Sequence, residues 1–223
     1  MTTTTGRVAW DDDASAGEWI AGRLGEFGPR VDGTVPRGYA AYACVPHPCC
    51  DDGGTALATQ ADALAAVLAP FTGDQPVHLG LWTGHGFFYD HGTDPRATSG
   101  VAPFVGWPED EPRPTPEESE RALDDARGHI APTLVERPAA PMLELPHREY
   151  HLWTGTLGDV GAFRDHQPPN LWWPADRSWF VGTEIDAAAT YVGGSDALAR
   201  AVCADPTLRA SRVAPSDRML FDD

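Results

Sequence analysis

The order of helix-like and strand-like segments constrains the fold of this chain more than any other feature. The segment TALATQADALAAVLAPF (55–71) is rich in Ala and Leu and predicts a helix that ends at Pro70. Apolar segments typical of strands lie before and after it, near 35–45 and 76–84. Helices and strands follow one another irregularly along the rest of the chain. We therefore expect an α+β fold, with a mixed or antiparallel sheet packed against about four helices.

Three further helices are expected from their local patterns. In AGEWIAGRLGEF (16–27), apolar residues recur at helical spacing after a run of acidic residues and give the expected helix one apolar face; they are Trp19, Ile20, Leu24 and Phe27. The segment PEESERALDDARGHI (116–130) begins with Pro and two Glu residues, which suit the first turn of a helix. The last helix is expected over 195–205.

The other segments of the C-terminal half resemble strands. They are PMLEL, REYHLWTG and DRSWFVGTEID. In the helix that follows them, Ser195 suits the N-cap position, which explains this serine better than a nucleophilic role does.

The expected domain organisation is simple. Residues 1–13 are interpreted as a disordered or polar N-terminal tail, and residues 14–223 as one α+β domain. The stretch 103–116 is rich in Pro and acidic residues without apolar periodicity, which indicates a surface loop.

The charge of the chain restricts its partners. The formal net charge is −17, and all basic residues other than histidine are Arg. Such acidity disfavours nucleic acid and favours a basic protein partner. No segment has the roughly 20 apolar residues that span a bilayer, and the N-terminus does not resemble a signal peptide. We expect a cytoplasmic protein with no membrane association, in which the cysteines are reduced.

The tetrapeptide LWTG occurs twice, at 81–84 and 152–155. The similarity does not extend beyond four residues, so a duplicated domain is the weaker interpretation. We expect two strand ends that lie near each other, for example on adjacent strands of one sheet, with tryptophans in the core.

The pentapeptide HREYH contains the first candidate site. On a strand, His147, Glu149 and His151 would share one face, and two histidines with one carboxylate suit zinc, iron or manganese. However, the two histidines would be ~13 Å apart at Cα. A polar strand face with satisfied histidines is the alternative, and no metal or other cofactor is expected.

The loop CVPHPCC is the second candidate. Cys44, His47, Cys49 and Cys50 are soft metal ligands, but no second Cys/His pair has matching spacing, and Cys203 lies on an expected helix. Loop cysteines without a ligand role are the preferred interpretation.

The stretch PNLWWPADRSWFVGTEID (169–186) is the third candidate. On a strand, Glu184 and Asp186 would lie on one face as paired carboxylates, able to act as acid and base or to hold a cation. Trp172 and Trp173 would then be exposed for binding. The alternative is an edge whose acids are neutralised by arginine, with a turn at Asp176–Arg177.

The same stretch, together with TYVGGS (190–195), resembles a family of uncharacterised conserved proteins from high-GC Gram-positive bacteria. The segment VPRGYAAYACVPHP (35–48) looks like the N-terminal signature of that family, although a basic residue is expected where Cys44 stands. The family has no established activity, so the resemblance implies no role for any residue. At the level of class only, the chain is also similar to bacterial immunity proteins, which are acidic α+β domains.

The leading functional hypothesis is a non-enzymatic binding protein, for example of the immunity type. Its binding residues would be Trp172, Trp173 and Arg177, facing a basic partner. The alternative is a metal-assisted hydrolase or a carbohydrate-active enzyme. Its catalytic candidates, which must converge in one pocket, are His147, Glu149, His151, Glu184 and Asp186.

Overall fold

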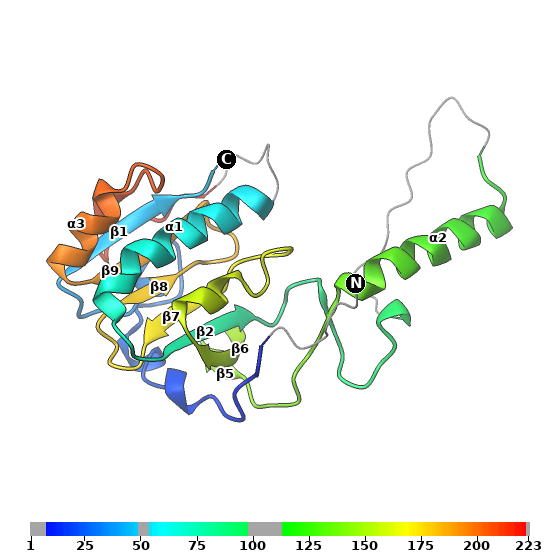
Figure 1. Cartoon of the computed structure of the whole chain (residues 1–223), viewed down its shortest axis with the longest axis horizontal. Coiled ribbons are helices and arrows are strands. Elements are labelled where there is room, and N and C mark those ends of the chain that lie inside the picture. The colour runs from blue at the N-terminus through cyan, green and yellow to red at the C-terminus, as the bar shows by residue number, and fades with distance from the viewer. Residues whose placement is uncertain (1–7, 49–53, 98–112, 222–223) are drawn as a thin grey trace. The chain divides into compact units, whose positions relative to one another are not determined.

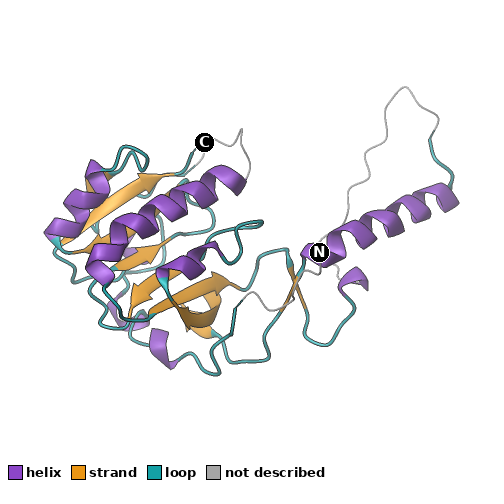
Figure 2. Cartoon of the chain, in the orientation of Figure 1, coloured by secondary structure: helices purple, strands orange, loops and turns teal. Residues whose placement is uncertain are grey.

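An antiparallel sheet forms the centre of the protein. The computed structural model describes residues 8–48, 54–97 and 113–221, and within them eight strands join in the order β10-β1-β9-β8-β7-β2-β6-β5. Every neighbouring pair in this sheet is antiparallel. The strands are β1 (Ala41–Pro46), β2 (Val77–Trp82), β5 (Leu143–Leu145), β6 (Arg148–Gly155), β7 (Leu171–Pro174), β8 (Phe180–Gly182), β9 (Ala189–Gly194) and β10 (Ser211–Val213). The α+β class is confirmed (Figure 2).

Three of the expected helices are present as α-helices. They are α1 (Gly54–Thr72), α2 (Pro116–Ile130) and α3 (Asp196–Ala204). Helix α1 continues for two residues beyond Pro70, which was expected to end it. In this last turn the Thr72 hydroxyl donates to the Leu68 carbonyl at 2.9 Å. The 3₁₀ turns are η1 (Ser15–Gly17), η2 (Ala21–Arg23), η3 (Val31–Gly33), η5 (Pro95–Ala97), η6 (Ala131–Thr133) and η7 (Leu157–Gly161).

The prediction of a helix over 16–27 is wrong. This segment forms only the turns η1 and η2. Its glycines disfavour a helix, and a Cβ at Gly17 would come within 2.6 Å of the Leu143 side chain, so the chain approaches β5 too closely for a larger residue. The expected apolar face forms only in part, since Ile20 is fully buried whereas Phe27 is 45% exposed.

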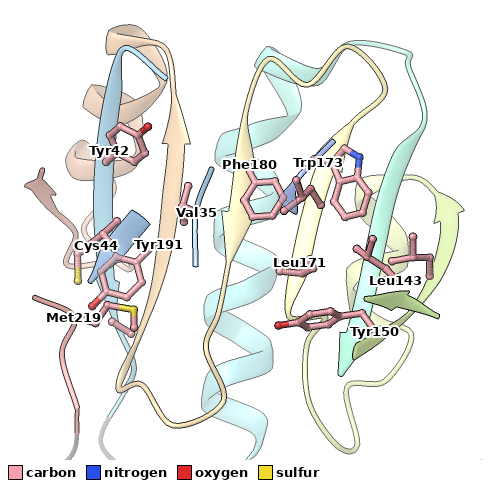
Figure 3. Close-up of a cluster of buried hydrophobic side chains, with 14 residues drawn as sticks. Val35, Tyr42, Cys44, Leu143, Tyr150, Leu171, Trp173, Phe180, Tyr191 and Met219 are labelled. Carbon is pink, nitrogen blue, oxygen red and sulfur yellow. The ribbon is translucent and has the colours of Figure 1, made fainter. Parts of the chain in front are cut away.

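The two faces of the sheet are covered by different parts of the chain. Helices α1 and α3 lie next to each other over one face (Figure 1). On the other face, residues of the N-terminal segment such as Ile20 and Val35, together with Met219, complete a cluster with side chains from the strands. Figure 3 shows this cluster, in which Trp173 and Phe180 come from neighbouring strands. The central strands are therefore buried on both sides.

The LWTG repeat proves to be two adjacent strands. Strands β2 and β6 pair in antiparallel register, with Leu79 opposite Trp153 and Gly80 opposite Leu152. The expectation of adjacent strands is confirmed. Because the strands run in opposite directions, the two copies begin beside each other at Leu81 and Leu152 and then diverge, so only their first residues lie near each other. Trp153 is buried, whereas Trp82 is half-buried.

The described part of the N-terminal segment is not a free tail. The Asp11 amide donates to the Leu152 carbonyl at 2.9 Å, and Trp10 forms a bridge with Trp153. The Trp10 ring also stacks on Phe163, with centroids 5.7 Å apart. These apolar contacts hold residues 10 and 11 against β6. Residues 1–7 lie outside the described part of the chain.

The chain divides into two compact units. One consists of residues 7–83 and 140–223, which we call the sheet unit, and the other includes residues 84–139, which we call the small unit. The small unit contains α2 and a parallel pair of β3 (Phe88–Tyr89) and β4 (Val135–Glu136). The single domain expected over 14–223 stays a prediction, and residues 103–112 of the expected loop lie outside the described part. None of the helices in the described ranges is both long and apolar enough to cross a membrane.

We expect Ser195→Ala to lower the free energy of unfolding by about 1 kcal/mol. The Ser195 hydroxyl caps α3 by accepting from the Leu198 amide at 3.1 Å, as expected from the sequence. Without it, this amide at the helix N-terminus loses its partner. Urea unfolding measures the change. Ser195→Asp should keep the stability, because Asp also caps helices. An equal loss in both variants would contradict a capping role.

Candidate functional site

The structure does not bring the histidines and the carboxylate of HREYH together. Strand β6 begins at Arg148, and His147 has a φ of 63° in the two-residue turn between β5 and β6. A positive φ after Pro146 is typical of a type II turn. His147 is therefore outside the strand alternation, and its expected place on a common face is wrong.

Glu149 and His151 have different surroundings. Glu149 is exposed opposite Glu144, whereas His151 is only 3% exposed and lies against Trp10, with ring centroids 5.7 Å apart. Among the residues that the structure describes, no group of three or more His, Cys, Asp or Glu side chains is placed to hold a metal ion. This geometry does not support the metal interpretation of HREYH.

The two carboxylates of TEID are bound to an arginine. Strand β8 ends at Gly182, so Glu184 and Asp186 lie beyond it and not on a strand face. Arg148 donates to Glu184 through Nε at 3.1 Å and through Nη2 at 2.5 Å, and to Asp186 at 3.3 Å. The alternative of arginine-neutralised acids therefore describes this site better than an acid–base pair.

Arg148 was not singled out from the sequence, although a signal was present. In β6 it shares the alternating face of Tyr150 and Leu152, which are core residues. A charged residue on a core-facing position requires a counter-charge. Its guanidinium also lies over the rings of Phe27 and Trp82, 5.2 Å and 5.8 Å from their centroids. Arg148 thus joins β6 to the segment after β8.

Trp172 and Trp173 are not exposed anchors, and that expectation is wrong. They are 2% and 0% exposed, because β7 lies between β2 and β8 with both faces of the sheet covered. The Trp172 indole N–H donates to the Pro169 carbonyl at 2.7 Å. Trp173 stacks on Phe180 with centroids 5.9 Å apart. Both tryptophans are core residues.

Arg177, the third expected binding residue, is exposed. The turn expected at Asp176–Arg177 is present, since the Arg177 amide donates to the Pro174 carbonyl at 2.8 Å. Arg177 has a φ of 58°, and its guanidinium lies over the ring of Trp19.

The CVPHPCC loop is described only in part. Cys44 is buried in β1, and burial raises the pKa of its thiol. Cys203 is half-buried in α3, and both are free thiols. Cys49 and Cys50 lie outside the described residues. His47 is placed by a contact of 3.1 Å between its Nε2 and the Thr190 Oγ1.

A pocket under α1 is the best candidate for a functional site. It lies on the α1 face of the sheet, opens to solvent, and encloses a space of about 20 Å³ that a water-sized sphere can occupy. Its apolar wall includes Val45, Leu57, Leu64 and Trp172, together with two consecutive prolines at 168–169. The pocket thus combines the first half of α1, the ends of β1 and β7, and the turn before β7. HREYH forms no part of it, and of TEID only Thr183 lines it.

Hydrogen bonds hold three of the polar side chains of the pocket in place. The hydroxyls of Thr183 and Thr190 are 2.8 Å apart, and Thr190 also contacts His47. Gln60 donates to the Pro46 carbonyl at 2.8 Å. These bonds fix the side chains of Gln60, Thr183 and Thr190, which all line the pocket. The hydrogen-bonding direction of the two hydroxyls depends on which nitrogen of His47 carries the proton.

The described lining of the pocket contains no ionisable side chain. Its polar members are two glutamines and two threonines. A charged ligand would lose hydration there without gaining a counter-charge, which is costly. The stretch 169–186, singled out from the sequence, supplies three of the lining residues, but most of the others come from α1, β1 and β9, which no common motif connects, so the sequence did not reveal the pocket.

Comparisons with known proteins add no assignment. No family model matches the chain, and neither the curated proteins nor the solved structures gave a significant match. The resemblance to proteins of high-GC Gram-positive bacteria therefore stays a prediction.

Proposed function

We propose that this protein is a non-enzymatic binding protein that holds a small uncharged molecule in the α1 pocket. The observation that carries the proposal is the composition of the pocket, which has an apolar wall, a few fixed polar groups and no ionisable side chain among its described residues. Ligand sites in proteins typically have this composition. In a protein with a formal charge of −17, a lining without charged side chains is unusual and therefore supports an uncharged ligand.

The size and polarity of the pocket define the ligand class. The enclosed space that a water-sized sphere can occupy is only about 20 Å³, which is room for about one water molecule. A ligand no larger than one ring with a short substituent would therefore insert a small group there and keep the rest of its body in the open mouth of the pocket. The Thr183 hydroxyl or the Gln60 amide would bind one hydroxyl or carbonyl group of the ligand, while Leu57, Leu64 and Trp172 contact its apolar part.

This proposal keeps the binding class expected from the sequence but changes the site and the partner. A basic protein partner was expected to dock on exposed Trp172 and Trp173, and both are buried. The enzyme alternative required five side chains to converge. His151 lies on the Trp153 face of β6, whereas Glu184 is bound to Arg148 on the other face. Neither alternative has a described site to support it.

The test uses four probes of similar shape. We expect benzyl alcohol and benzamide to shift the amide NMR signals of Thr183 and Thr190 and the indole N–H signal of Trp172. Benzoate and benzylamine, which are charged at pH 7, should leave these signals in place. Thr183→Val removes one neutral hydrogen bond and should weaken benzamide binding about fivefold.

Matched substitutions in α1 locate the binding. Ala61 lines the pocket and Ala66 is exposed on the same helix. Ala61→Phe should abolish the shifts by filling the space, whereas Ala66→Phe should leave them unchanged. Equal shifts with the charged and uncharged probes, or binding that persists in Ala61→Phe, would overturn the proposal.

A further inference from the structure

We propose that Trp19, Arg23 and Arg177 form a second site, which binds a small organic anion through one carboxylate or phosphate group. The site belongs to the sheet unit and is independent of the α1 pocket. Trp19 contacts Trp173 and Phe180, on the face of the sheet opposite to that of Trp172. The two sites therefore make separate predictions.

The two arginines converge on one aromatic ring. The guanidinium of Arg23 is 5.6 Å from the ring centroid of Trp19, and that of Arg177 is 5.1 Å from it. Trp19 is half-buried, while both arginines are exposed. Contacts with Trp173 and Phe180, at centroid distances of 6.4 Å and 5.9 Å, fix the indole. A fixed ring that holds two cations prearranges their donors for an anion.

In the described part of this acidic protein, Arg23 and Arg177 differ from six other arginines in having no salt bridge. Within the described chain, neither Arg23 nor Arg177 forms a salt bridge with a carboxylate. Six other arginines do: Arg37, Arg96, Arg137, Arg148, Arg164 and Arg212. Two cations that lie over one ring without such partners are favourable for an external anion.

The backbone of Arg177 supports a role for its side chain. Its φ of 58° lies in the left-handed region, which glycine or asparagine adopts more easily. The conformation is held by the Tyr39 hydroxyl, which donates to the Arg177 carbonyl at 3.2 Å. The conformation of the turn therefore gives no reason for an arginine at this position. The contact of its guanidinium with the ring of Trp19 does give a reason.

The neighbouring charges limit the kind of anion. Burial raises the pKa of Tyr39, against the influence of Arg23 and Arg177, so this hydroxyl stays protonated beside the two cations. The nearby acids are Glu18 in the chain next to Trp19, and Asp176, whose carboxylate accepts from the Ser178 amide at 2.9 Å. With a net charge of −17, the protein repels polyanions such as nucleic acids. A single anionic group fits these surroundings best.

The test is a titration of the full chain with inorganic phosphate and with acetate at constant ionic strength. We expect saturable shifts of the Trp19 indole N–H signal and the Arg23 and Arg177 Nε–H signals, without shifts at Thr183 in the α1 pocket. Arg23→Gln and Arg177→Gln should each weaken binding about tenfold, since each removes a charge-assisted hydrogen bond.

The control is Arg209→Gln, which changes another exposed arginine with a positive φ of 48° and should bind like the unmodified chain. Arg23→Gln separates loss of charge from any change in the Arg177 turn. Shifts that do not saturate or that chloride reproduces would show only screening and would overturn the proposal. Unchanged affinity in Arg23→Gln would do the same.

Discussion

Trp173→Ala should lower the free energy of unfolding by about 4 kcal/mol, the largest effect we expect from a single substitution. Trp173 is fully buried in the central strand β7, where it stacks on Phe180 and lies near Trp19. Truncation to Ala removes most of the side chain and leaves a cavity that its neighbours in the sheet cannot fill. Urea unfolding followed by circular dichroism measures the change.

The control for Trp173 is an exposed aromatic residue. Phe221 is 38% exposed near the C-terminus, and Phe221→Ala should change stability by less than about 1 kcal/mol. If Trp173→Ala kept its stability and lost the binding of a basic protein, the exposed-anchor hypothesis would be right and the buried position wrong.

Arg148→Met should lower the free energy of unfolding by about 3 kcal/mol. The side chains of Arg148 and Glu184 are 18% and 10% exposed, so removal of the guanidinium leaves the Glu184 carboxylate largely desolvated and without its cation. The effect is at the lower end for buried ion pairs because Arg148 is not completely enclosed. The same urea experiment measures it.

A double variant tests the cause. Arg148→Met/Glu184→Gln should be more stable than Arg148→Met, because the carboxylate left without its cation is then also removed. Arg212→Met provides the exposed control, since the Arg212–Asp196 pair is open to solvent and should contribute little. Asp186→Asn should also have little effect, because the Asp186 side chain is 73% exposed. If Arg148→Met were as stable as the unmodified chain, the ion pair would have no structural role.

The elements that the sequence predicted well are those whose signals are local. Helix α2 begins at Pro116 because Thr115 and Glu118 form a capping box, with the Glu118 amide donating to the Thr115 hydroxyl and the Glu118 carboxylate accepting from the Thr115 amide. Helix α3 begins after Ser195 for a similar reason. Strand β6 also has the predicted residues, because alternating side chains define it. Each of these depends on residues only a few positions apart.

The functional candidates depended on contacts between distant segments, and most of them changed. The tryptophan pair of β7 was expected to be exposed for binding, but Trp172 packs on the α1 face of the sheet and Trp173 packs against the N-terminal segment on the other face. The acids of TEID looked like a catalytic pair until Arg148, 36 positions before Glu184, neutralised them. A sequence pattern shows which face of a strand a residue occupies but not what covers that face.

By itself, the amino-acid sequence determined the α+β class, three α-helices, the longest strand and the acidity of the protein. Only the tertiary structure decided the order of the strands, the burial of Trp172 and Trp173, and the pocket under α1. His47 and Thr190, which meet at that pocket, are separated by 143 positions. Local propensities act over a few residues, whereas long-range contacts arise only when the whole sheet assembles and selects which side chains share one space.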